Sequence, residues 1–224
     1  MADSTWTLEA CAGFTRGGGP PAPDHDADHA TRQGRVVAEQ ARLLRWAEEN
    51  GQLRRRPLPW PEFARGGEHR VFYRQSNQRY YKATLAERQK GYGIALGSFS
   101  RGATPAEYLD RQALHNRLFN DDIRLEYILE NRGFPLIVIS QPGVRGLTPS
   151  QTAIDAMMRT KGLEPLAPGA FYDAKAGLLI FDLIPRNAIL TADGGVFPID
   201  PVIQRIDPDF AEFLHRHPNT INLS

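Results

Sequence analysis

Three polar residues in the C-terminal part of the sequence have the types that phosphate chemistry requires and lie close together in the sequence. Asp182 opens the run Asp182-Leu-Ile-Pro-Arg-Asn187, and Asp200 follows eighteen residues after Asp182. Phosphoryl transfer needs a carboxylate to receive or orient the attacking hydroxyl, and it needs a carboxylate and an amide oxygen to hold magnesium against the phosphates. The alternative is that these residues only cap turns, as most Asp and Asn residues in loops do.

The elements around these residues are expected to bring them to one place. An apolar strand at 178–181 ends at Asp182. A predicted hairpin at 188–199 then carries the chain from Asn187 to Asp200, because two strand-like runs flank an Asp-Gly turn. This strand context favours a chemical role for the three residues over simple capping.

A lysine in the N-terminal half could supply the cation that the α- and β-phosphates of a nucleotide need. Lys82 lies in the strand-like run Arg79-Tyr-Tyr-Lys-Ala-Thr84, and Glu107 on a later helix is the candidate to pair with it. Glu87 and Glu126 are competitors for the same role. A lysine on an edge strand is commonly only a guard against aggregation, so the interpretation of Lys82 depends on the downstream loop.

Gly66 and Gly67 precede the first strand of this half and are candidates for a phosphate-covering loop. Glycine lets backbone N–H groups come close to phosphate. The pair is not a complete Gly-x-Gly-x-x-Gly motif, and two glycines before a strand more often form only a turn.

The pattern of apolar residues predicts an α+β fold. Strands and one helix occupy the middle of the chain, and further hairpins with one or two helices follow. The helices are expected at 28–50, 104–119 and 150–160, and the strands at 70–73, 79–84, 125–129, 136–140, 170–172, 178–181, 188–190 and 196–199.

The N-terminal residues are predicted to lie outside the site. Residues 1–27 are rich in Gly and Pro and then acidic, a composition that indicates a flexible tail. Residues 28–62 are expected to form an amphipathic helix and a Pro-rich linker. The apolar stripe of that helix would pack on the body of the protein or bind a partner.

Bulk composition excludes several classes of protein. Hydrophobic residues make up 41% and charged residues 24%, which is typical of a globular protein rather than a disordered or membrane-spanning chain. Nothing at the N-terminus resembles a signal peptide. Cys11 is the only cysteine, so no intramolecular disulfide can form and a reducing cytoplasm is expected. A formal charge of +1 argues against a nucleic-acid partner.

Together these motifs resemble the protein-kinase-like superfamily, and more closely the compact kinase domain found in the polyvalent proteins of phages and conjugative elements. The spacing from Asp182 to Asn187 and to Asp200 is similar to that of the kinase catalytic loop and the metal-binding Asp after it. The resemblance covers about residues 65–205. The matching text is Glu68-His-Arg-Val71, Tyr81-Lys82-Ala-Thr84, Thr104-Pro-Ala-Glu-Tyr-Leu-Asp-Arg111, His115-Asn116, Leu118-Phe119, Ile139-Ser-Gln-Pro142, Phe181-Asp182 to Asn187 and Asp193-Gly194 to Asp200.

The resemblance implies a minimal two-lobed kinase-like fold that binds ATP and Mg²⁺ in its cleft. The N-lobe would span 63–141 and the reduced C-lobe 142–224. The implied roles are catalytic base for Asp182, magnesium ligands for Asn187 and Asp200, phosphate binding for Lys82, and adenine contact through the backbone at Gln141.

The sequence also departs from ordinary protein kinases. Ile180-Phe181 stand where His-Arg precedes the catalytic Asp, and Asp200-Pro-Val202 stands in place of Asp-Phe-Gly. Only 24 residues follow Asp200, so an activation segment and a peptide-binding platform are not expected. The acceptor could therefore be a protein, the chain itself or a small molecule.

Three functions fit this sequence. The first is an ATP-dependent phosphotransferase that acts on an unidentified protein hydroxyl or on itself. The second keeps the fold but transfers AMP, since nucleotide orientation decides which phosphorus is attacked. The third is a pseudokinase that binds nucleotide or a partner without turnover.

Overall fold

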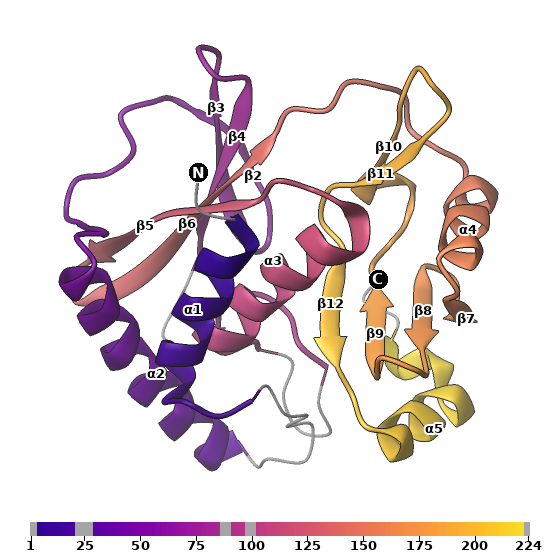
Figure 1. Cartoon of the computed structure of the whole chain (residues 1–224), viewed down its shortest axis with the longest axis horizontal. Coiled ribbons are helices and arrows are strands. Elements are labelled where there is room, and N and C mark those ends of the chain that lie inside the picture. Colours follow the sequence, from indigo (N-terminus) through magenta and orange to yellow (C-terminus); the bar gives the residue numbers. More distant parts are fainter. Residues whose placement is uncertain (1–3, 21–28, 86–90, 97–101, 222–224) are drawn as a thin grey trace. The chain divides into compact units, whose positions relative to one another are not determined.

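The protein folds into two compact units, described here from a computed structural model (Figure 1). The structure describes residues 4–20, 29–85, 91–96 and 102–221. The first unit contains the described residues up to Gly143, and the second contains those from Val144 onward. Both combine helices and strands, which confirms the predicted α+β fold class.

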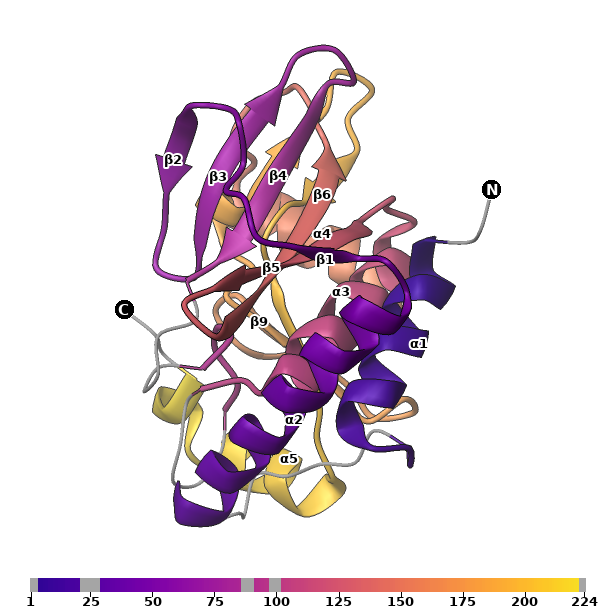
Figure 2. The same cartoon turned by 90° about the vertical axis from the view of Figure 1, so that its left-hand side faces the viewer.

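The first unit is built on a six-stranded sheet with the order β1-β5-β6-β4-β3-β2 (Figure 2). All neighbouring strands are antiparallel except β1 and β5. The strands are β1 (Leu53–Arg54), β2 (Glu62–Arg65), β3 (His69–Arg74), β4 (Arg79–Thr84), β5 (Arg124–Asn131) and β6 (Phe134–Pro142). The predicted pairs of strands around 75–78 and around Gly133 are confirmed as the hairpins β3–β4 and β5–β6.

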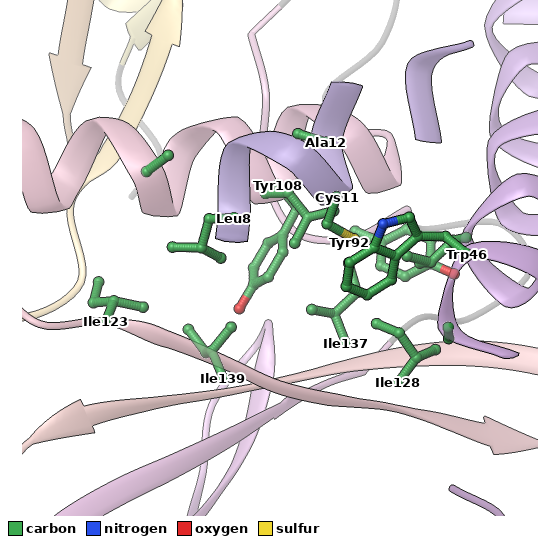
Figure 3. Close-up of a cluster of buried hydrophobic side chains, with 14 residues drawn as sticks. Leu8, Cys11, Ala12, Trp46, Tyr92, Tyr108, Ile123, Ile128, Ile137 and Ile139 are labelled. Carbon is green, nitrogen blue, oxygen red and sulfur yellow. The ribbon is translucent and has the colours of Figure 1, made fainter. Parts of the chain in front are cut away.

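Three helices bury their apolar side chains against one face of this sheet. They are α1 (Ser4–Arg16), α2 (His29–Glu49) and α3 (Pro105–Phe119). Figure 3 shows their shared core, in which Tyr108 of α3 and Trp46 of α2 meet Ile137 and Ile139 of β6. A second, smaller apolar cluster is formed by Leu58, which lies between β1 and β2, and by side chains of strands β3 to β6. The strand residues are Phe72, Tyr81, Ala83, Leu129 and Val138.

The start of α3 is fixed by a capping box, as the Thr-Pro sequence suggests. The Thr104 hydroxyl accepts a bond from the Glu107 N–H at 3.3 Å, and the Glu107 carboxylate accepts one from the Thr104 N–H at 2.8 Å. Two of the four N–H groups that every helix leaves without an intrahelical partner are satisfied in this way.

Helix α1 contradicts the flexible tail that composition predicted for residues 1–27 over Ser4–Arg16, and residues 1–3 and 21–27 of that prediction lie outside the described residues. Leu8, Cys11 and Ala12 follow helical spacing and are completely buried in the main core. Burial raises the pKa of the Cys11 thiol to about 12. The prediction failed because it averaged over the whole segment, whereas the Gly- and Pro-rich residues begin only after Arg16. The predicted helix at 28–50 is confirmed as α2.

The second unit contains a four-stranded antiparallel sheet and a separate hairpin. The sheet has the order β12-β9-β8-β7, with β7 (Glu164–Ala167), β8 (Ala170–Asp173), β9 (Leu178–Phe181) and β12 (Val202–Arg205). The hairpin joins β10 (Ala188–Leu190) and β11 (Val196–Pro198), and the 3-10 turn η1 (Pro185–Asn187) precedes it. Two helices, α4 (Gln151–Thr160) and α5 (Pro208–Arg216), and the 3-10 turn η2 (Pro218–Ile221) complete the unit.

The strands and helices of the second unit agree in part with those predicted from the sequence. Both predicted hairpins and the helix at 150–160 are present, with Ser150 as the cap of α4. Strands β7 and β12, helix α5 and turn η2 were not predicted. Among the described residues, no helix is both long enough and apolar enough to cross a membrane.

If α1 is part of the folded core, truncating Leu8 must destabilise the protein. We expect Leu8→Ala to lower the free energy of unfolding by about 2–4 kcal/mol, because it removes a buried side chain and leaves a cavity. Urea denaturation followed by circular dichroism measures this change. The control is Val37→Ala on the exposed side of α2, where Val37 is 56% exposed, and a change within about 0.5 kcal/mol is expected there. Equal and small effects of the two substitutions would contradict a docked α1.

Candidate active site

Asp182 leaves a strand whose position is fixed by burial. All four residues of β9 are buried, and the chain turns directly after Phe181. Asp182 has a φ of 54°, a left-handed conformation that Asp tolerates better than most side chains. The turn therefore begins at the residue to which sequence analysis assigned the chemistry.

Asn187 closes this turn through its side chain. Its Nδ2 donates to the Asp182 carbonyl oxygen at 2.7 Å and to the Asp182 carboxylate oxygen Oδ2 at 2.9 Å. Pro185 opens the 3-10 turn η1, which carries Asn187 back toward Asp182. The predicted pair thus forms one hydrogen-bonded loop, and the donated bonds direct the amide oxygen of Asn187 away from Asp182.

Asp200 is brought to the same place by strand pairing. β9 and β12 are antiparallel, with Phe181 opposite Val202. Asp182 comes one residue after Phe181 and Asp200 comes two residues before Val202, so both carboxylates lie at the same end of the strand pair. The Ile199 N–H also donates to the Asn187 carbonyl oxygen at 2.9 Å, which ties the two polar segments together.

The backbone of the turn is held from two further elements. The Leu183 N–H donates to the Gly169 carbonyl oxygen at 3.0 Å, and Gln151 of α4 donates through Nε2 to the Leu183 carbonyl oxygen at 3.3 Å. Gly169 has a φ of 71°, and a Cβ atom there would lie 2.7 Å from Ile184. A glycine is therefore required where the β7–β8 turn meets this loop.

A pocket of about 560 Å³ opens beside Asp182 within the second unit. Three segments form its wall: the β7–β8 turn, the loop after β9, and η2. Its lining combines polar and apolar surface in nearly equal parts and includes two charged residues, Asp182 and Arg186. The Arg186 guanidinium lies 3.5 Å from Oδ1 of Asp182, the carboxylate oxygen that does not face Asn187. Neither Asn187 nor Asp200 belongs to the lining.

Lys82 lies in the first unit, on an interior strand. β4 is paired with β3 on one side and β6 on the other, and Lys82 stands opposite Val71 and Ile139. The explanation of Lys82 as an edge-strand guard is therefore wrong. Directly opposite residues share a sheet face, so Lys82 is on the face of Ile139, which packs in the core with α3.

Glu107 has a structural role that sequence analysis did not foresee. Besides capping α3, its carboxylate forms an ion pair with Arg32 of α2 at 2.5 Å. These contacts do not support the expected pairing with Lys82. Of the two competitors, Glu126 accepts a hydrogen bond from Ser140 at 2.5 Å, and Glu87 lies outside the described residues.

An ion pair that was not predicted ties α3 to the sheet. Arg111 of α3 donates to Glu68, just before β3, at 2.9 Å, and the Arg111 side chain is only 4% exposed. The other carboxylate oxygen of Glu68 accepts from the Ile94 N–H at 2.8 Å. No local pattern in the sequence indicates a pair separated by 43 residues.

The remaining nucleotide-site candidates lie at two ends of the same sheet. Gly66 and Gly67 form the β2–β3 turn, where the Gly66 N–H donates to the His69 carbonyl oxygen at 2.9 Å. Both glycines are exposed. Gln141 lies near the end of β6, opposite Tyr80, and its side chain donates to Asp121 at 2.7 Å. The chain passes into the second unit just after it, at Gly143.

The donor atoms of the second unit fit a magnesium ion. Mg²⁺ prefers oxygen ligands and is commonly held by one or two carboxylates together with substrate phosphates. Asp200 offers a carboxylate, and Asn187 offers the amide oxygen that its own hydrogen bonds direct away from Asp182. These two residues could therefore hold the ion.

Comparison with known proteins identifies the family. The family model described as a serine/threonine/tyrosine kinase found in polyvalent proteins matches residues 37–207. The chain belongs to this family. Searches of the curated proteins and of the solved structures each gave no significant match.

The close contact at Gly169 gives a test of the loop geometry. We expect Gly169→Ala to lower the free energy of unfolding by about 1–3 kcal/mol more than Gly162→Ala, because only the first adds a clash with Ile184. Gly162 also has a positive φ of 79° but has nothing within 4 Å of an added Cβ, so it controls for backbone strain. Urea denaturation of both variants measures the difference, and equal costs would contradict the contact.

Proposed function

We propose that this member of the polyvalent-protein kinase family is a magnesium-dependent phosphotransferase that moves the γ-phosphoryl group of ATP to a hydroxyl group. The observation that carries the proposal is the meeting of Asp182, Asn187 and Asp200 at one end of the β9–β12 pair. These are the groups needed to handle an attacking hydroxyl and a metal-bound phosphate.

Asp182 would act on the acceptor. Its carboxylate accepts a hydrogen bond from Asn187 through Oδ2, and Oδ1, which lies 3.5 Å from the Arg186 guanidinium, would accept the hydrogen of an incoming hydroxyl. The hydroxyl oxygen then forms a bond to the γ-phosphorus, the bond from that phosphorus to the bridging oxygen breaks, and the electron pair leaves with ADP. Because the transition state of such transfers is loose, positioning accounts for most of the catalysis.

Asn187 and Asp200 would hold Mg²⁺, which neutralises charge on the transferring phosphate. The bonds from Asn187 to Asp182 couple the proposed metal side of the loop to the proposed acceptor side. One displacement of Asn187 would disturb both.

Lys82 would bind the α- and β-phosphates. In protein kinases the corresponding lysine is on the third strand, after a glycine-containing loop between the first two. The run β2, β3, β4 has the same order here, with Gly66-Gly67 in the first turn and Lys82 on the third strand. The backbone near Gln141, where the chain leaves the sheet, is the proposed contact for adenine.

Incubation with ATP labelled at either the γ- or the α-phosphate tests the reaction. We expect release or transfer of γ-label that requires magnesium, and a fall of about 10²–10⁴-fold in Asp182→Asn and Asp200→Asn, because each loses a carboxylate of the site. Asp193→Asn is the matched control, since Asp193 is an exposed carboxylate in the β10–β11 turn bonded to Thr191. It should retain activity.

The other outcomes separate the alternatives. Transfer of α-label would show AMP transfer instead. Binding of magnesium and ATP without any turnover would indicate a pseudokinase. Absence of nucleotide binding would contradict the proposal altogether.

The role of Lys82 predicts a phosphate-specific loss of affinity. We expect Lys82→Met to weaken ATP binding by about tenfold or more, because a charge-assisted contact to phosphate is lost. Adenosine affinity should change less than about twofold, since adenosine has no phosphate. Isothermal titration calorimetry measures both, and Lys175→Met, in the exposed β8–β9 turn, is the control. Equal losses for ATP and adenosine would contradict a phosphate contact.

A further inference from the structure

The two oxygen atoms of the Asp182 carboxylate have different surroundings. Oδ2 accepts from Asn187, one of the proposed magnesium ligands. Oδ1 lies 3.5 Å from Arg186, which lines the pocket described above. Asn187 and Asp200 do not line this pocket. Asp182 is therefore hydrogen-bonded to a proposed magnesium ligand and also borders the pocket.

We infer that this pocket is the acceptor site of the chain and that it takes a compact hydroxyl compound or a single hydroxyl side chain. This inference rests on the proposed function. An acceptor must place its hydroxyl between Asp182 and the γ-phosphorus, with its oxygen roughly in line with the leaving oxygen of ADP. The pocket borders Asp182 within the second unit, and the proposed magnesium ligands Asn187 and Asp200 are outside its lining.

The size of the pocket limits what it can enclose. Sites for small molecules commonly have volumes of about 300–1,000 Å³, and this pocket has about 560 Å³. It can hold a metabolite-sized molecule or one side chain, whereas an extended peptide would not fit inside. The acceptor class is therefore defined by one compact group that carries the hydroxyl.

The lining defines the chemistry of that group. Ile184, Pro218 and Ile221 supply an apolar wall, and Asn219 supplies an amide. Arg186 is the lining residue with a positive charge, and its side chain is 71% exposed. An acceptor with an apolar body and an anionic substituent near its hydroxyl would match this surface, since Arg186 can pair with the anion while Asp182 receives the hydroxyl proton.

The wall formed by η2 allows the pocket to be blocked chemically. Cys11 is the only cysteine in the sequence, and it is fully buried with a pKa of about 12. A cysteine introduced at Asn219 would therefore be the reactive thiol of the folded protein. Modification of Asn219→Cys with fluorescein maleimide would fill the pocket without changing Asp182, Asn187 or Asp200.

We expect the modified Asn219→Cys protein to lose γ-phosphate transfer and release from ATP by about tenfold or more. Its affinity for magnesium–ATP should stay within about twofold of the unmodified variant. The control is Glu212→Cys, treated with the same reagent. Glu212 is an exposed residue of α5 and is not part of the pocket lining. Unchanged transfer after full modification at residue 219 would overturn the inference. No Asp182-dependent transfer in the unmodified protein would instead contradict the proposed function, and the inference with it.

Two phenols of similar size test the charge preference. 3-Hydroxybenzoate carries a carboxylate and 3-(aminomethyl)phenol carries an ammonium group on the same side of the ring as the hydroxyl, so we expect γ-label on the first at least about fivefold faster than on the second. Arg186→Gln should reduce this ratio toward one. Equal labelling of the two compounds, or no label on either compound or on the protein, would contradict the anionic class. Label on the protein rather than on the added phenol would show that the source of the hydroxyl is a side chain.

Discussion

The pairing of β9 with β12 is the constraint on which the candidate site depends. Residues on β9 are buried throughout, so the strand cannot shift in register without exposing apolar side chains. Since Phe181 stands opposite Val202, the residues that continue from these two positions must meet at one end. Asp182 and Asp200 are near each other because a buried strand pair fixes them, and neither carboxylate needs a direct bond to the other.

The first unit depends on contacts that reach α3 from the N-terminal helices. Arg32 pairs with Glu107 and donates to the Gly102 carbonyl oxygen at 2.9 Å, and Glu39 accepts from the Ala106 N–H at 2.9 Å. Burial raises the pKa of Glu39 despite that bond. Helices α1 and α2 therefore belong to the fold that supports Lys82. The partner of Glu107 is Arg32 of α2.

Sequence reasoning succeeded where the deciding information was local. The hairpins, the Thr104 cap and the loop from Asp182 to Asn187 are all set by residues within a few positions of one another, and each is present in the structure. It failed where partners are distant. The Arg111–Glu68 pair and the Arg32–Glu107 pair join residues 43 and 75 positions apart, and no periodicity reports such contacts. The roles of Lys82, Gly66, Gly67 and Gln141 stay predictions, because the structure gives their positions and not their ligands.

The arrangement around Asp182 indicates how one loop could combine a constant reaction with a variable acceptor. Asn187 donates to Oδ2 of the carboxylate and accepts from the Ile199 N–H, and a change at Asn187 would disturb the proposed metal site. The β7–β8 turn and η2 line the pocket, and Gly169 in that turn also accepts a hydrogen bond from the Leu183 N–H through its carbonyl oxygen. Side chains on the pocket wall can change without altering the hydrogen bonds that hold Asp182. On the proposed function, acceptor specificity can diverge while the phosphate chemistry stays the same, because the pocket wall and the proposed magnesium ligands are different residues.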